Sequence, residues 1–181
     1  MTSWARRSAF PRLAFWGLAL SAVGLVVAQA LLSVPNVLRS WGGPVGEAAL
    51  LDAPGHDWRT VEAVRAYLGH FKPEGVAAYL HQQLPLDTAF PLAYGSFGAL
   101  AVWAAFPGRR RMLCVVWLVA MAFDLLENGA IVRILSTDAS ALGQDQIDAF
   151  LHCHDLKWAA LAVATPLLIL ALVLIVRRRM A

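Results

Sequence analysis

The sequence predicts an all-α membrane protein, a bundle of four transmembrane helices with a short amphipathic helical cap on its extracytoplasmic side. Hydrophobic residues make up 59% of the 181 residues and charged residues only 15%, whereas a soluble domain is nearer a quarter charged. The apolar residues are gathered into four long stretches with no charge. Alternating segments of about ten residues, the pattern of a membrane β-barrel, do not occur.

Each uncharged stretch, with its flanks, approaches the ~20 residues that a helix needs to cross a hydrocarbon core of ~30 Å. We therefore predict one membrane domain over residues 1–181, with transmembrane helices at about 13–34, 88–107, 112–134 and 155–176. The first stretch also fits a cleavable signal peptide, because arginines precede an apolar run that contains Ala28-Gln29-Ala30. That run continues to Val34 and is long enough to span, so a retained helix is favoured and cleavage is the alternative.

Arginine clusters predict the orientation of these helices. They precede the first span, separate the second from the third, and follow the fourth, at 6–12, 109–111 and 177–179. Because cytoplasmic loops carry an excess of Lys and Arg, we expect both termini in the cytoplasm, with the chain in a bacterial inner membrane. The same placement argues against nucleic acid as a partner, although the isoelectric point is near 9.2. Membrane lipids are the expected partners.

The connection at 36–86 contains the predicted cap. Apolar residues at helical spacing follow Asp57 and Thr60, either of which can cap a helix that ends near residue 69. Another helix is expected to start at Pro73, because proline suits a helix's first turn. Both would lie on the outer face within 57–83, as a packed cap or as a lid over a site. Three aromatic residues are expected near the lipid headgroups: Trp58, Tyr67 and Tyr79.

Polar residues enter the outer halves of the predicted spans, and the most informative are Asp87, Tyr94, Asp124, Glu127, Asn128 and Lys157. Asp124, Glu127 and Asn128 share one helical face, because they are spaced i, i+3 and i+4. A charge near the bilayer centre costs ~2.5–3.5 kcal/mol, so it usually faces the bundle interior and is paired. Lys157 is the cation expected to pair with Asp124 or Glu127. Two acids would then face one lysine. Either one of the two carboxyl groups is protonated, or a ligand, a metal or a water-filled cavity balances the second negative charge.

These residues predict a pocket for a hydrophobic, lipid-like small molecule, because apolar walls with a few converging polar groups are the usual form of such a site. Asp124 and Glu127 are the candidate catalytic acid and base, since burial favours the protonated form of a carboxyl group. The candidate ligand-binding residues are Asp87, Tyr94, Asn128 and Lys157. No metal or cofactor is assigned. The sequence leaves open whether the protein is an enzyme and whether it forms oligomers.

Other functions compete with this one. A structural or assembly protein would use the same ion pairs only to register its helices. The run His152-Cys153-His154-Asp155 offers metal-ligand types, but histidines at i, i+2 diverge on a helix and no HExxH or CxxC motif occurs. Intramembrane acids also suit a proton-coupled transporter, although four helices without an internal repeat argue against alternating access.

Several motifs carry a resemblance to known groups: Lys72-Pro73-Glu74-Gly75, Asp87, Phe90-Pro91-Leu92-Ala93-Tyr94-Gly95, Asp124-Leu125-Leu126-Glu127-Asn128 and Lys157. Over roughly 57–176 the chain resembles uncharacterised four-helix bacterial integral membrane proteins, which implies a fold but no activity. Its topology more weakly resembles the EXPERA group of sterol isomerases and sterol-binding proteins. That resemblance implies a lipid-facing pocket whose carboxylates stabilise or shuttle charge. The catalytic His/Glu pattern of those isomerases has no clear match here.

Overall fold

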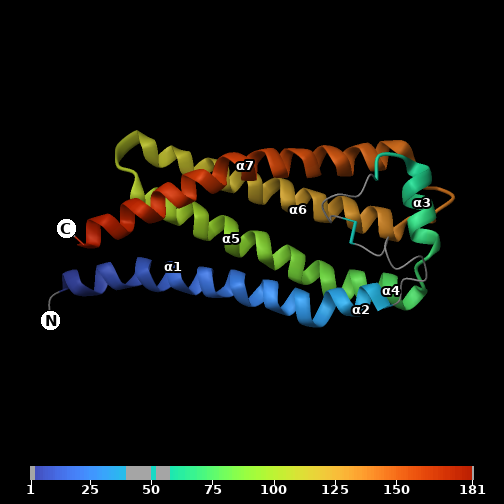
Figure 1. Ribbon diagram of the computed structural model, residues 1–181, viewed down its shortest axis with the longest axis horizontal. Helices are drawn as coiled ribbons and strands as arrows, with labels where there is room; N and C mark the ends of the chain where they lie inside the picture. Colours follow the sequence, from blue (N-terminus) through green and yellow to red (C-terminus); the bar gives the residue numbers. More distant parts are fainter. Residues whose placement is uncertain (1–2, 40–49, 52–57, 181) are drawn as a thin grey trace.

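The computed structural model describes residues 3–39, 50–51 and 58–180, with side chains from Trp16 onward (Figure 1). Within these residues four helical runs are long and apolar enough to cross a membrane: Trp16–Arg39, Pro73–Ala105, Gly108–Ser136 and Gln144–Arg178. The all-α class is confirmed, and the four runs indicate a multi-pass membrane protein. Asp57 and the loop before it lie outside the described residues.

The elements of the described chain follow one another in this order: α1 Ser3–Ala28, the π-helical η1 Gln29–Ser33, α2 Val34–Arg39, α3 Val61–Gly69, α4 Pro73–Ala78, the π-helical η3 Tyr79–Gln83, α5 Leu84–Ala105, the 3₁₀ turn η4 Gly108–Cys114, α6 Val115–Ser136 and α7 Gln144–Met180. Gly108 adopts a φ of 59°, in the left-handed region that glycine enters without steric cost. It begins the short turn that makes α5 and α6 antiparallel neighbours.

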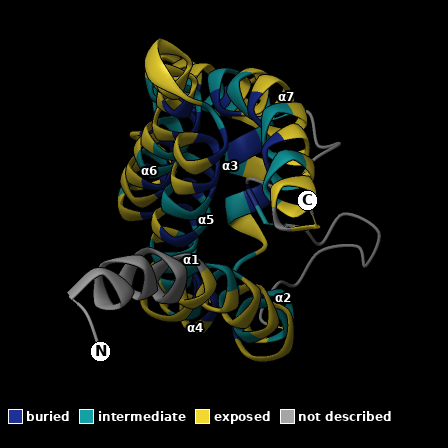
Figure 2. Cartoon of the chain, turned by 90° about the vertical axis from the view of Figure 1, so that its left-hand side faces the viewer, coloured by how far each residue is buried: buried dark blue, intermediate teal, exposed yellow. Residues whose placement is uncertain are grey.

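Helix α5 is the centre of the bundle. It packs against α1, α6 and α7, whereas α1 makes its main helix contacts with α5 and stands away from α7 (Figure 2). The two ends of the chain and η4 lie at one end of the bundle, and α3 lies across the opposite end (Figure 1). This arrangement separates the arginine-rich end from the end that carries α3.

The second predicted cap helix differs from the expectation. It begins at Pro73 as predicted, but α4, η3 and α5 form one continuous helix up to Ala105. The physical reason is η3, whose wider turn ends two residues before Pro85. Because proline removes an N–H and crowds the carbonyl four residues earlier, a widened turn lets the helix continue past it. In the first helical run, the π-helical η1 likewise ends two residues before a proline, Pro35.

Helix α3 is the part of the predicted cap that forms a separate short helix. Thr60 caps it, since its Oγ1 accepts a hydrogen bond from the Ala63 N–H at 3.2 Å. Tyr67 and Tyr79 are buried in an apolar cluster with the ends of α6 and α7, so their rings pack inside the protein and do not face the lipid headgroups. They are buried because α3 packs inward onto this cluster. For α3, the structure supports the packed cap.

Candidate functional site

A cavity of about 520 Å³ lies between η1, α5, α6 and α7. Apolar side chains form most of its wall: Leu50, Phe90, Trp117, Trp158 and Leu161. Its polar lining comes from Gln29, Asp87, Tyr94, Asp124 and Lys157. Three of the ten lining residues, Asp87, Phe90 and Tyr94, are spaced i, i+3 and i+7 and therefore share one face of α5. The cavity thus has apolar walls with polar groups concentrated on α5, α6 and α7.

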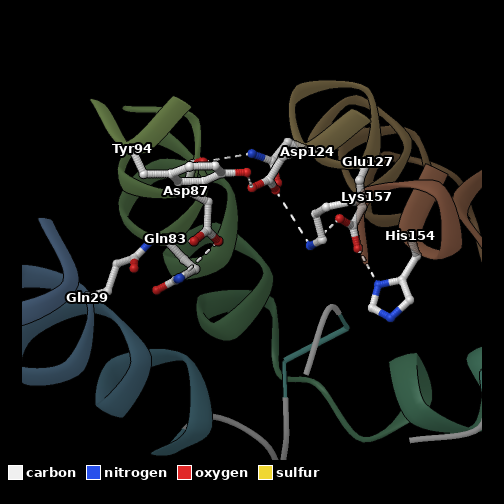
Figure 3. A network of polar contacts seen from close by, with 9 residues as sticks. Gln29, Gln83, Asp87, Tyr94, Asp124, Glu127, His154 and Lys157 are labelled. Atoms are coloured by element: carbon white, nitrogen blue, oxygen red, sulfur yellow. Dashed lines mark hydrogen bonds and ion pairs between the residues drawn. The ribbon is translucent and has the colours of Figure 1, made fainter. Parts of the chain in front are cut away.

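A continuous chain of polar contacts crosses the bundle beside this cavity (Figure 3). The Tyr94 hydroxyl donates to Asp124 Oδ2 at 2.7 Å, and Asp124 Oδ1 lies 3.5 Å from Lys157 Nζ. Lys157 also contacts Glu127 Oε2, and Glu127 Oε1 lies 2.6 Å from His154 Nδ1. Three donors therefore alternate with two carboxylates, and each carboxylate uses a different oxygen for each partner.

Asp87 lies at another part of the cavity, in the hydrogen bonds that join the two π-helical segments. Gln29 and Gln83 donate from their side-chain amides to its two carboxylate oxygens, the latter at 2.9 Å. Ser33 in turn donates to Gln83 Oε1 at 2.6 Å. These hydrogen bonds hold the Asp87 side chain at the cavity wall.

Asn128 has a structural role that the sequence did not reveal. Pro91 lies inside α5 and has no N–H, so it cannot supply the usual i+4 hydrogen bond to the carbonyl oxygen of Asp87. The Asn128 side-chain amide donates to that oxygen at 2.9 Å. An asparagine on α6 thus replaces the hydrogen bond that proline removes from α5, at a position where Asn128 is only 5% exposed.

The structure divides the six predicted site residues into two groups. Asp87, Tyr94, Asp124 and Lys157 line the cavity. Glu127 and Asn128 are buried and do not line it, so their predicted direct contact with a ligand is not supported. The reason is rotation about α6: residues three apart point roughly 60° from one another. Asp124 points to Tyr94 on α5, whereas Glu127 points to His154 on α7.

The cap differs from the lid that was the alternative expectation, whereas His152 and His154 diverge on their helix as predicted. No described residue between 58 and 83 lines the cavity, so α3 does not act as a lid over it. His152 and His154 both lie on α7, where His152 is exposed and His154 turns inward to Glu127. Within the described residues, no three or more His, Cys, Asp or Glu side chains gather where they could hold a metal ion.

Sequence reasoning did not assign a site role to Gln29, Gln83 or His154. Their signal was weak, because a single amide or imidazole near the end of an apolar run is also compatible with an exposed position at the membrane surface. The partners of Gln29 and His154 are distant in sequence, 58 and 27 residues away, and Gln83 also accepts a hydrogen bond from Ser33, 50 residues away. Only the packing of the helices identifies these partners.

Comparison with protein-family models, curated protein sequences and solved structures found no match to this chain. Its class therefore rests on its own residues: an all-α, multi-pass membrane protein with a polar cluster and a cavity inside its helix bundle.

Proposed function

We propose that this protein binds a hydrophobic, lipid-like small molecule in the cavity between η1, α5, α6 and α7. The cavity itself is the observation that carries the proposal. Its volume of about 520 Å³ lies within the ~300–1,000 Å³ that is usual for small-molecule sites. Its wall combines indole, phenyl and leucyl groups with a few polar groups, which suits a molecule with a large apolar body and one small polar end.

The polar end of the ligand would lie against Tyr94, Asp124 and Lys157. These side chains approach one another at one part of the wall, and the Tyr94 hydroxyl and the Asp124 carboxylate each have lone pairs that can accept another hydrogen bond. Carrying charges into a membrane is costly. This cluster is larger than is needed to register the helices, and its size therefore favours a functional role. Asp124 is the better candidate for proton transfer, since it lines the cavity and Glu127 does not.

The orientation in the membrane is part of the proposal. We place the arginine-rich end in the cytoplasm of a bacterial inner membrane and α3 on the outer side, because basic residues favour the cytoplasmic side. In a variant without Cys114 and Cys153, a cysteine at exposed Met112 should resist an impermeant thiol reagent in intact cells. A cysteine at exposed Ser140 should react. The opposite pattern would refute this orientation.

Binding is testable without knowing the ligand. The purified protein would be examined by native mass spectrometry and by lipid extraction, to find a molecule that is retained beyond bulk phospholipid. Asp124→Asn and Tyr94→Phe keep the side-chain shapes and should lower its retention several-fold. Asp155→Asn is the matched control, since it removes an exposed carboxylate from α7. Equal retention in all three variants, or no retained molecule in the wild type, would contradict the proposal.

The alternative function is structural. Glu127, Asn128 and His154 do not line the cavity and bond to other protein groups, as polar residues that register helices do. Under this alternative the protein would retain only bulk phospholipid, while Asp124→Asn would alter helix association or thermal stability. Measuring retention and stability on the same variants therefore separates the two functions.

A further inference from the structure

The polar chain continues beyond the cavity, to a residue that the proposed binding site does not include. His154 does not line the cavity, and its side chain is 20% exposed. Its Nδ1 lies 2.6 Å from Oε1 of Glu127, which is 1% exposed. A carboxylate only accepts hydrogen bonds, so the ring must donate from Nδ1. Aromatic rings of Phe150 and Trp158 flank the imidazole and restrict its movement.

Lys157 links the His154–Glu127 contact to the cavity. Its ammonium lies between two carboxylates, Glu127 behind the cavity and Asp124 at the cavity wall. The contact with Glu127 is the closer one, and the distance to Asp124 Oδ1 is 3.5 Å. The position of one ammonium therefore decides how much negative charge Asp124 presents to the cavity (Figure 3).

We propose that His154 is a positioning residue for the cavity: by holding the Glu127 carboxylate, it keeps the Lys157 ammonium on Glu127 and leaves Asp124 available to a ligand. Without the imidazole, Glu127 can rotate away, and Lys157 moves closer to Asp124, its other acidic partner among the described residues. Asp124 then becomes a closed ion pair, and a ligand that hydrogen-bonds to it loses affinity. A residue outside the cavity thus controls the polar group inside it.

This inference rests on the proposed ligand binding, and its first test measures retention of the co-purifying molecule. His154→Ala should lower retention about three- to tenfold, the effect of one typical hydrogen bond. His154→Asn is the rescue variant, because its amide nitrogen can occupy the position of Nδ1, and it should restore most of the retention. His152→Ala is the matched control, since His152 is an exposed histidine on the same helix. Equal retention in His154→Ala and wild type would overturn the inference.

A second test requires no ligand. His154 and Asp124 are not hydrogen-bonded to one another and communicate through Glu127 and Lys157, so their substitutions should be non-additive in unfolding free energy. Additive effects of His154→Ala and Asp124→Asn would overturn the positioning role. If the two residues are coupled but the wild type retains no molecule, the binding proposal fails and the polar chain is structural. If retention is normal without coupling, binding stands and His154 has no part in it.

Discussion

Replacing Asn128 with leucine should show how much the proline inside α5 destabilises the protein when no side chain replaces its missing hydrogen bond. The substitution keeps the size of the side chain and removes the amide that donates to the Asp87 carbonyl at 2.9 Å. The usual i+4 donor to that carbonyl is missing, because residue 91 is proline. A buried carbonyl left without a donor costs ~1–3 kcal/mol, and measured interhelical hydrogen bonds in membranes reach ~1.7 kcal/mol. We therefore expect Asn128→Leu to lower the free energy of unfolding by about 1–2 kcal/mol.

The diagnostic measurement is the same substitution made after Pro91→Ala. Alanine at position 91 supplies an N–H that can reach the Asp87 carbonyl within the helix, so Asn128 is no longer its necessary donor. Asn128→Leu should then cost less than about 0.5 kcal/mol, a non-additivity measurable by equilibrium unfolding in mixed micelles. Pro166→Ala on α7 is the control background, in which the full cost should persist. An equal cost in the Pro91→Ala and wild-type backgrounds would refute this explanation of Asn128.

Two other predictions concern stability. Gly98→Ala would place a Cβ 2.2 Å from Trp117 Cδ2, so it should destabilise by about 1–3 kcal/mol despite the better helix propensity of alanine. Gly129→Ala, where nothing lies within 4 Å, should be neutral or stabilising, and equal melting temperatures for the two variants would contradict the close packing of α5 on α6. Lys157→Met should cost about 3–5 kcal/mol by leaving Glu127 uncompensated in the bundle, and Glu127→Gln should restore part of it. Strictly additive losses in detergent unfolding would argue against this ion pair.

Local patterns predicted the long helices and some of their ends. Spans follow from uninterrupted apolar length, which depends on each segment alone, and all four appear in the structure. Thr60 and Pro73 start helices as predicted, because a cap and a fixed φ act within one turn. The pairing of Lys157 with the acids of α6 was also predictable, since counting residues along antiparallel helices places them at similar depth.

Only the tertiary structure decided which polar groups reach the cavity. Asp124 and Glu127 share a helical face, and the sequence treats them alike. Their roles separate because α5 and α7 lie on either side of that face, so one acid meets Tyr94 and the other meets His154. Asn128 likewise serves a backbone carbonyl on another helix, whose need for a donor depends on Pro91. These differences come from the rotation and packing of whole helices, which no spacing within a single helix records.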